Sequence, residues 1–168
     1  MIRIRPYKDS DREKIFSWCP DADTFYKWTA GVLGAYPITA EAFQKTGELM
    51  RFTALDEKDP VGFFTVRNPR DTLEEVRIGF VLLDPRKRGR GYGKQMLQLG
   101  LRYAFEIYGA ETVSLGVFEN NAPAYRCYYA AGFRETGTRE VYTVNGQQWV
   151  AIDMECRRED RQKAKTAP

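Results

Sequence analysis

The stretch that decides the fold is Asp84-Pro85-Arg86-Lys87-Arg88-Gly89-Arg90-Gly91-Tyr92-Gly93-Lys94. Residues 78–83, immediately before it, form a short continuous apolar run, which predicts a buried strand. After it, apolar residues recur at steps of three and four as far as Tyr108, the spacing of an amphipathic helix. The predicted order is therefore a strand, a glycine-rich loop and a helix.

This order predicts a phosphate-binding site. The first turn of a helix carries backbone N–H groups without a partner in the helix, together with the positive end of the helix dipole. Glycines can adopt left-handed dihedrals and have no side chain to keep a ligand away from these amides. We therefore expect the loop to bind phosphate through its backbone. Its cationic side chains would add to the attraction, and they are Arg86, Lys87, Arg88, Arg90 and Lys94.

The spacing of the glycines limits which class of phosphate ligand the loop can bind. A P-loop requires Gly, four residues and then Gly-Lys-Ser/Thr, but counting back from Gly93-Lys94 reaches Arg88, and Gln95 has no hydroxyl for magnesium. The dinucleotide fingerprint Gly-x-Gly-x-x-Gly is one residue longer in its last interval than this loop. Neither pattern fits.

Two segments carry a resemblance to a known family. The pattern Arg88-x-x-Gly91-x-Gly93, between a strand and a helix, resembles the pyrophosphate-binding motif of the GNAT superfamily of acyl-CoA-dependent N-acetyltransferases. Residues 121–133 are similar to the family segment Asn-x-x-Ala-x-x-x-Tyr-x-x-x-Gly-Phe. The resemblance covers residues 1–157, which we take as one acetyltransferase domain, and leaves residues 158–168 as a charged tail expected to be disordered.

The resemblance implies the α+β acyl-CoA N-acyltransferase fold. Its centre would be a mixed, mostly antiparallel sheet of about seven strands flanked by helices, with the fourth and fifth strands parallel and splayed apart. The residues themselves predict strands at 2–5, 51–55, 61–66, 74–83, 112–118, 138–144 and 147–156. The turn Asn145-Gly146 predicts a hairpin that pairs Tyr142 with Trp149 and Val141 with Val150.

Capping signals predict three helices besides the one after the glycine loop. Ser10 and Glu13 form a capping-box pattern for residues 11–18, and Thr39 is a suitable N-cap for a helix through residue 45. Asn121 begins a third helix at residues 122–131, which Gly132 ends. Residues 21–37 are expected to be irregular and rich in aromatic side chains that cover the sheet. The resemblance makes three of them candidates to face a substrate, namely Asp23, Tyr26 and Trp28.

The resemblance also implies roles for individual residues. Tyr128 would protonate the departing thiolate, with an ordinary core tyrosine as the alternative. Asn121 would contact the pantetheine arm of the cofactor, although N-capping alone explains it. The remaining cofactor-binding residues would be the strand backbone before the loop and the loop itself, namely Val81, Leu82, Leu83, Arg88, Gly89, Arg90, Gly91, Tyr92, Gly93 and Lys94.

The general base is assigned by a weaker argument. Related sequences often place a carboxylate just before the Ile-Gly pair of the fourth strand, where this chain has Arg77. Our candidate is therefore Glu75 acting through a water molecule, with a merely solvated surface glutamate as the alternative.

Composition excludes several mechanisms. The chain has 168 residues, a net charge of +3 and no histidine, which excludes a Ser-His-Asp triad, a Cys-His pair and histidine-ligated metal. Its three cysteines lack metal-ligand spacing, so we expect no metal site and reduced thiols in the cytoplasm. No signal peptide or membrane-length apolar stretch is present, and the mild charge suggests no nucleic-acid or membrane partner.

These observations together predict an N-acetyltransferase. It would transfer an acetyl group from acetyl-CoA to a primary amine by direct attack in a ternary complex. The sequence does not decide whether the acceptor is a small amine or polyamine, an antibiotic amine or a protein N-terminus. It also leaves the oligomeric state undecided, with a homodimer among the options. The alternative function is a nucleic-acid or nucleotide-binding module that uses the Arg/Gly loop without acyl transfer.

Overall fold

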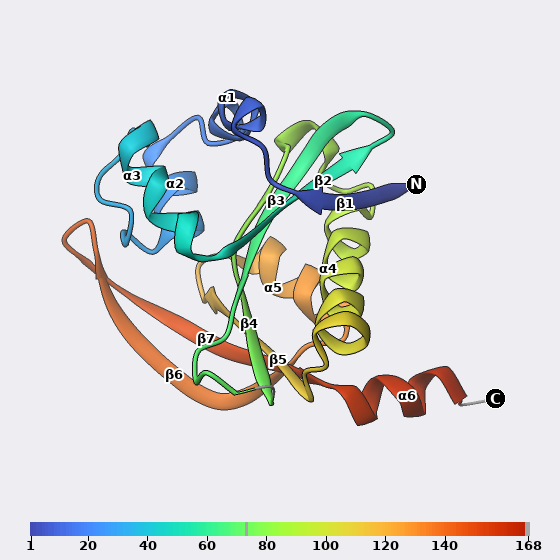
Figure 1. Cartoon of the computed structure of the whole chain (residues 1–168). Helices are drawn as coiled ribbons and strands as arrows, with labels where there is room; N and C mark the ends of the chain where they lie inside the picture. Colours follow the sequence, from blue (N-terminus) through green and yellow to red (C-terminus); the bar gives the residue numbers. More distant parts are fainter. Residues whose placement is uncertain (73, 167–168) are drawn as a thin grey trace.

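A mixed sheet of seven strands forms the centre of the molecule in a computed structural model that describes residues 1–72 and 74–166 (Figure 1). The strand order is β1-β2-β3-β4-β5-β7-β6, and only β4 and β5 are parallel neighbours. This confirms the predicted fold class. The strands are β1 Ile2–Pro6, β2 Met50–Asp56, β3 Asp59–Arg67, β4 Glu75–Leu83, β5 Thr112–Phe118, β6 Arg134–Val144 and β7 Gln147–Arg157.

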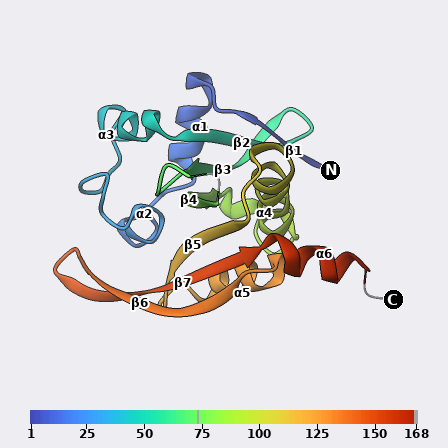
Figure 2. The ribbon, with the colours of Figure 1, turned by 60° about the horizontal axis from the view of Figure 1, so that its bottom comes forward.

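Helices cover both faces of the sheet, as Figure 2 shows. Alternation along β3 separates two cores, because Phe63 packs among residues of the first three helices while Phe64 and Val66 pack against α4 and its neighbours. The helices are α1 Arg12–Ser17, α2 Ala22–Thr29, α3 Ala40–Gln44, α4 Tyr92–Arg102, α5 Ala122–Ala131 and α6 Arg158–Thr166. Short 3₁₀ turns lie at Asp9–Asp11, Lys45–Glu48 and Pro85–Lys87, and a π-helical turn, Tyr103–Tyr108, extends α4.

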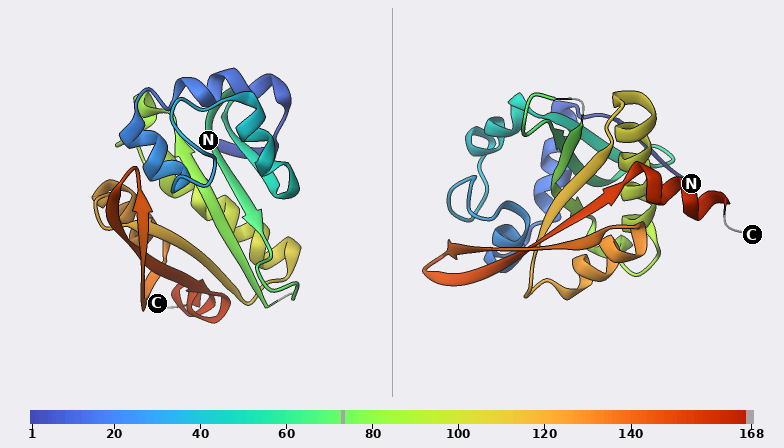
Figure 3. Two further views of the ribbon diagram at one scale, coloured as in Figure 1. Left: turned by 90° about the vertical axis from the view of Figure 1, so that its left-hand side faces the viewer. Right: turned by 90° about the horizontal axis from the view of Figure 1, so that it is seen from below.

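The sheet divides where β4 meets β5. These two strands pair only from Glu75 opposite Thr112 to Arg77 opposite Ser114. Beyond that point they diverge, as Figure 3 shows, while β5 continues to pair with β7 along its whole length. From residue 78 onward, β4 therefore has a backbone edge with no partner strand on its β5 side among the described residues.

A bulge in β4 lies at the start of this unpaired edge. Thr65 of β3 pairs with Gly79 and Phe63 pairs with Leu82, so β4 has one more residue than β3 in this interval. Phe80 lies in the bulge with a φ of 46°, in the left-handed region that residues other than glycine rarely adopt. The bulge turns the backbone of β4 toward the gap between the strands.

The N-terminal third departs from the sequence prediction in two places. Ser10 is not the cap of α1, which follows directly on the 3₁₀ turn Asp9–Asp11 and has no side-chain capping bond. Within that turn Asp11 accepts a hydrogen bond from the Lys8 amide at 3.1 Å and binds Arg5 in a partly buried ion pair. The expected irregular segment contains α2, because Asp21 caps it by accepting from the Thr24 amide at 2.7 Å.

The caps of Thr39 and Asn121 are confirmed, since each side chain accepts a hydrogen bond from the amide three residues later. The hairpin register of Tyr142 with Trp149 and Val141 with Val150 is confirmed as well. β6 begins at Arg134, earlier than predicted, because an irregularity between Glu135 and Arg139 lets pairing with β7 resume.

In the segment expected as a disordered tail, residues 158–166 form α6, and residues 167–168 lie outside the described ranges. The first residue of α6, Arg158, donates hydrogen bonds to the carbonyl oxygens of Phe105 and Ala110 at 2.7 and 2.6 Å. This anchor ties the start of α6 to the end of the helix before β5. None of the helices in the described ranges is both long enough and apolar enough to cross a membrane.

Candidate functional site

The loop between β4 and α4 presents its backbone to solvent. Gly89 and Gly91 adopt left-handed φ angles of 72° and 77°, and α4 begins after Gly91. A Cβ built on Gly89 would have no heavy atom within 4 Å, and one on Gly91 would meet only the Gln95 amide nitrogen at 3.9 Å. Nothing in residues 1–72 and 74–166 accepts a hydrogen bond from the Gly89, Arg90 or Gly91 amides. The loop therefore offers free donors to an anion.

Gly93 has a different role from the one expected. Its φ is not left-handed, and it lies in the first turn of α4. A Cβ at this position would approach the Cys127 sulfur to 2.9 Å, closer than side-chain contacts normally allow. Gly93 is therefore needed because α4 and α5 pack closely, not because of the loop's dihedrals.

Two of the five basic side chains in the loop are occupied within the protein. Arg86 binds the buried Asp84 at 2.8 Å, and this hydrogen bond is the main reason that the pKa of Asp84 is lowered. Lys87 binds Asp56 at 3.3 Å, beside the Tyr92 hydroxyl, which donates to the same carboxylate at 2.8 Å. The contacts of Lys87 and Tyr92 with Asp56 tie the loop to β2.

The other three basic side chains of the loop are free of such contacts. Arg88, Arg90 and Lys94 are exposed and form no ion pair with any residue that the structure describes. Three mobile cations thus surround the open amides.

A cavity of about 380 Å³ occupies the gap between β4 and β5. α2, the β4 bulge, the second half of β5, the start of α5 and the β6–β7 hairpin all contribute to its wall. Its volume is at the small end of the range for ligand pockets, which is roughly 300 to 1,000 Å³. The unpaired edge of β4 and Tyr128 of α5 lie in one continuous site.

Trp28 holds the β4 bulge from the side of α2. Its indole N–H donates to the Phe80 carbonyl oxygen at 2.9 Å, across 52 residues of sequence. Both residues line the cavity. Because this bond fixes the strained peptide after Phe80, it also fixes the direction of the neighbouring amides. Of the three candidates in the aromatic segment, Trp28 faces the cavity, whereas Asp23 and Tyr26 are not part of its lining.

Tyr128 contributes a phenol to the same cavity. The side chain is 7% exposed, and its ring packs against Phe133 at 6.4 Å between centroids. Burial raises the pKa of Tyr128 well above its ordinary value. No described residue forms a hydrogen bond with its hydroxyl, although the residue lines the cavity. A neutral phenol without a protein partner is available to donate to a group in the cavity.

The other expected pantetheine contacts divide into two groups. Asn121 lines the cavity while its side-chain oxygen accepts from the Ala124 amide at 3.4 Å, so it is both a cap and a wall residue. Leu82 and Leu83 pair with Phe63 and Gly62 of β3, and neither they nor Val81 contribute to the cavity wall. The β4 residues that do are Arg77, Ile78, Gly79 and Phe80.

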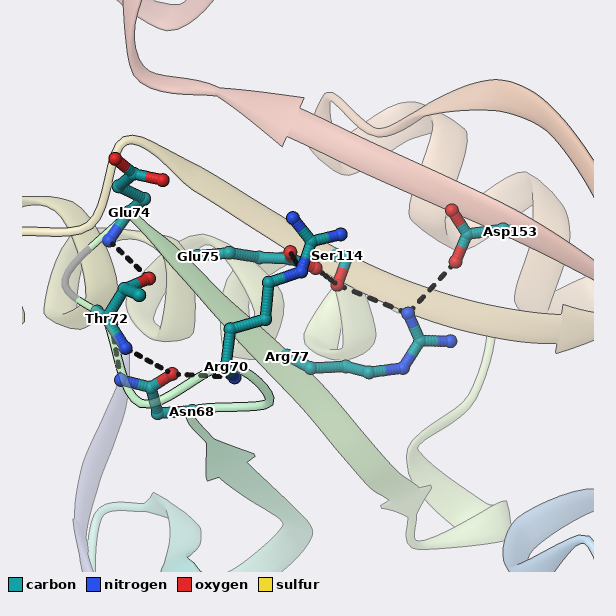
Figure 4. A network of polar contacts seen from close by, with 8 residues as sticks. All are labelled: Asn68, Arg70, Thr72, Glu74, Glu75, Arg77, Ser114 and Asp153. Atoms are coloured by element: carbon teal, nitrogen blue, oxygen red, sulfur yellow. Dashed lines mark hydrogen bonds and ion pairs between the residues drawn. The ribbon is translucent and has the colours of Figure 1, made fainter.

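Glu75 lies where β4 and β5 are still paired, and it is not among the residues that line the cavity. Figure 4 shows its side chain beside Ser114. Its carboxylate accepts a hydrogen bond from the Ser114 hydroxyl at 2.7 Å and forms an ion pair with Arg70 at 3.5 Å. Arg77 donates to the same hydroxyl at 3.2 Å and to Asp153 at 2.9 Å. The carboxylates that reach the cavity are those of Asp153 and Glu140.

A model of the acetyltransferase (GNAT) family matches residues 7–133, which is more than half of the chain. The protein belongs to the GNAT family. The match includes the glycine loop, the β4–β5 division and the whole of α5 up to Phe133.

Several curated GNAT enzymes are similar over part of their length. A spermine/spermidine N(1)-acetyltransferase of Bacillus subtilis (strain 168) is 38% identical over 86 residues, covering 48% of this chain and 57% of the relative. A mycothiol acetyltransferase of Corynebacterium glutamicum (strain R) is 34% identical over 87 residues, covering 52% and 29%. One from Rhodococcus opacus (strain B4) is 31% identical over 131 residues, covering 76% and 41%. This chain thus matches less than two thirds of each relative's length.

Solved structures share the fold over nearly the whole chain. The aminoglycoside acetyltransferase AAC(6')-Ib in complex with ribostamycin and coenzyme A superposes with a TM-score of 0.79 at 17% identity, covering 99% of both chains. A spermidine N-acetyltransferase from Vibrio cholerae in complex with CoA and spermine gives 0.78 at 17% identity, covering 94% and 96%. At such identities the likeness establishes the GNAT fold.

The sequence interpretation missed the cavity's charged side chains other than Arg77, which it noted only as a departure from the family pattern. They come from α2, β3, β6 and β7, and they are Lys27, Arg67, Glu140 and Asp153. No short motif joins them, since the sheet alone brings these strands together. The one available signal was the combination of an aromatic segment near residue 28 with the final hairpin.

Proposed function

We propose that this chain transfers the acetyl group of acetyl-CoA to the amine of an acceptor within one ternary complex. One arrangement carries the proposal, namely an open glycine loop beside a split sheet with a neutral tyrosine facing the split. The loop amides would bind the diphosphate of acetyl-CoA, with the free cations Arg88, Arg90 and Lys94 around it. The pantetheine arm would then lie along the unpaired edge of β4, hydrogen-bonding as an added strand does.

The chemistry follows from this placement. The lone pair of the acceptor nitrogen forms a C–N bond at the thioester carbon, and collapse of the tetrahedral intermediate breaks the C–S bond. Amides of the β4 bulge near Phe80 would donate to the carbonyl oxygen as it becomes negative. Tyr128 would donate its proton to the departing sulfur, and the phenol would be reprotonated from solvent.

Burial affects both the proton donor, Tyr128, and the departing thiolate that would receive its proton. The pKa of Tyr128 is raised by burial, which by itself weakens the phenol as an acid. Removal from water disfavours a bare thiolate as well, because burial destabilises the charged form of a thiol. A thiolate released there therefore gains more from a phenol donor than it would in water.

The acceptor's own proton has a less direct route. We propose that it passes to water, with Glu75 as a receiver beyond the cavity wall. Support for Glu75 is its hydrogen bond with Ser114, whose hydroxyl also accepts from the cavity residue Arg77. Its position outside the wall limits how much it can contribute to the rate.

Ligand-induced stabilisation tests the proposal. Acetyl-CoA at about a hundredfold excess over its Kd should stabilise the protein by roughly 2 to 3 kcal/mol in a thermal-shift titration. Pantetheine, which lacks the diphosphate, should stabilise it far less, and NAD or an oligonucleotide should have no effect. A salt-sensitive shift with the oligonucleotide and none with acetyl-CoA would instead favour the binding-module function. Release of free thiol with a panel of amines then measures the transfer itself.

A further inference from the structure

The wall of the cavity away from the glycine loop is unusually rich in charge. Three cationic and two anionic side chains line it, so the wall has a net positive charge. The cationic residues are Lys27, Arg67 and Arg77, and the anionic ones are Glu140 and Asp153. If this GNAT chain acts as proposed above, the acceptor has to enter past these groups.

Two of the cations are direct neighbours across a strand pair. Arg67 of β3 is the register partner of Arg77 of β4, so their side chains leave the same face of the sheet close together. Like charges directly opposite one another destabilise a sheet unless something between or beside them supplies negative charge. Such a pair at a cavity is therefore informative about what the cavity binds.

Only one member of this pair is neutralised within the protein. Arg77 donates to Asp153 at 2.9 Å and to the Ser114 hydroxyl at 3.2 Å. Arg67 is exposed and has no hydrogen-bond or ion-pair partner among the residues that the structure describes. Both arginines lie near the hairpin. The hydrogen bond to Glu140 and burial raise the pKa of Tyr142, and the positive charges of Arg77 and Arg67 offset part of this rise.

None of the remaining charged residues of the wall forms an ion pair with Arg67. Lys27 is one quarter exposed and forms an ion pair with Asp23, whose carboxylate is 64% exposed and outside the cavity wall. Glu140 accepts a hydrogen bond from the neutral Tyr142 hydroxyl at 2.7 Å, which leaves the negative charge of the carboxylate in place. The wall thus presents one cation and one anion without an ion-pair partner among the described residues, namely Arg67 and Glu140.

We propose that the acceptor is a small amine that also carries a carboxylate or another oxyanion, and that Arg67 binds this anionic group. A guanidinium binds such an oxyanion through two parallel hydrogen bonds. The anionic group at Arg67 would leave the amine free to reach the thioester near Tyr128. A polyamine, in contrast, has no anionic group for Arg67, and a positive charge placed against this unpaired guanidinium would oppose binding.

The test compares acceptors that differ only in the anionic group. Amino acids with the amine at the α, β or γ position are each compared with the corresponding primary amide, and spermidine is included. The measurement is kcat/KM by free-thiol release. At least one acid should be used about tenfold better than its amide and than spermidine. An α-amide has the less basic amine and so more of its neutral form, which biases the α comparison against the proposal.

Variants then assign the preference to one residue. Arg67→Met should raise the KM for the preferred acid about tenfold and bring it level with its amide, while the KM for acetyl-CoA stays the same. Arg67→Glu should reverse the preference. The matched control is Arg102→Met, an exposed arginine of α4 outside the cavity wall, which should change nothing.

The outcomes separate this inference from the proposed function. Failure to bind acetyl-CoA in calorimetry would overturn both. Binding of acetyl-CoA with transfer only to spermidine or amides, or with no transfer to any acid of the panel, would overturn the anionic acceptor alone. A preference for acids that survives in Arg67→Met would show that another residue binds the anion and would overturn the assignment of Arg67.

Discussion

The proposed site has two ends, the glycine loop at α4 and the hairpin side of the cavity, and they use different parts of the polypeptide to hold their ligands. At the α4 end, the available donors are backbone amides of residues 89–91, held open by left-handed glycines. At the hairpin end, the available groups are the charged side chains, such as Arg67 and Glu140. Backbone donors are the same in any sequence that keeps the glycines, whereas one substitution changes a side-chain site. Cofactor binding and acceptor choice are therefore expected to vary independently in this chain.

The largest effect is predicted for Gly91→Val. The valine would place branched carbons in front of the open amides and would be strained at a φ of 77°. Losing three charge-assisted amide bonds at about 1.5 kcal/mol each would weaken acetyl-CoA binding by roughly 10³-fold. Calorimetry with acetyl-CoA measures this change directly.

Gly109→Val is the matched control for backbone strain. Gly109 has a φ of 90° and open space around it, but it ends the helix before β5, away from the glycine loop. Equal losses of acetyl-CoA binding in both variants, with similar losses of stability, would mean that strain and not blocked amides explains Gly91.

Tyr128→Phe tests the proposed proton donor in the cavity. We expect kcat to fall roughly 10²-fold with little change in the KM for acetyl-CoA, as for a lost general acid. Tyr129→Phe should leave both constants unchanged, since that side chain is 50% exposed and packs on Tyr125 and Arg134 outside the cavity. A loss from Tyr129→Phe with none from Tyr128→Phe would move the acid to the neighbouring residue.

The pH profile adds a second measurement at Tyr128. A raised pKa keeps the phenol protonated to higher pH than an ordinary tyrosine, so the proton donor is not lost as the solution becomes alkaline. The rate should therefore rise while acceptor amines lose their protons, without a fall near pH 10, the ordinary tyrosine value. An alkaline fall near pH 10 that disappears in Tyr128→Phe would contradict the burial argument.

How much the sequence could predict differs between the two ends. The glycine loop, Tyr128 and Asn121 belong to short segments whose spacing carries the information, so the cofactor end could be located from local pattern. The hairpin register could also be predicted, because the Asn145-Gly146 turn fixes which residues of its two strands pair.

The acceptor end could not be located in the same way. Arg67 and Asp153 are 86 residues apart in number, and they share a wall only because β3, β4 and β5 connect them to β7. α2 was missed because tertiary packing of Phe25 and Trp28 in the core outweighs an irregular local pattern. The role of Gly93 depends on Cys127, a contact between helices that no local rule contains.

A smaller effect is predicted for Trp28→Phe, which keeps an aromatic ring but removes the hydrogen bond to Phe80. The freed carbonyl and the loosened bulge should lower kcat roughly tenfold, with acetyl-CoA still bound through the loop. The matched control is Trp18→Phe. Trp18 is also buried, but its indole N–H has no partner in the described residues, so its replacement should leave kcat unchanged. Equal losses of kcat would mean that ring volume, not the bond, matters.

The smallest effect is predicted for Glu75→Gln. The carboxylate lies outside the cavity wall and is held by Ser114 and Arg70, so it can receive the acceptor's proton only through water. Because water itself can accept the amine's proton, kcat should fall less than about threefold, far below the roughly 10²-fold loss expected for a direct general base. Since the neutral amine is the reactive form, the acid limb of the kcat/KM profile should follow the amine and stay in place. A loss of about a hundredfold together with a shifted acid limb would instead show that Glu75 is the base on which the reaction depends. The acceptor's proton would then leave the cavity toward the paired part of β4 and β5, where Glu75 lies.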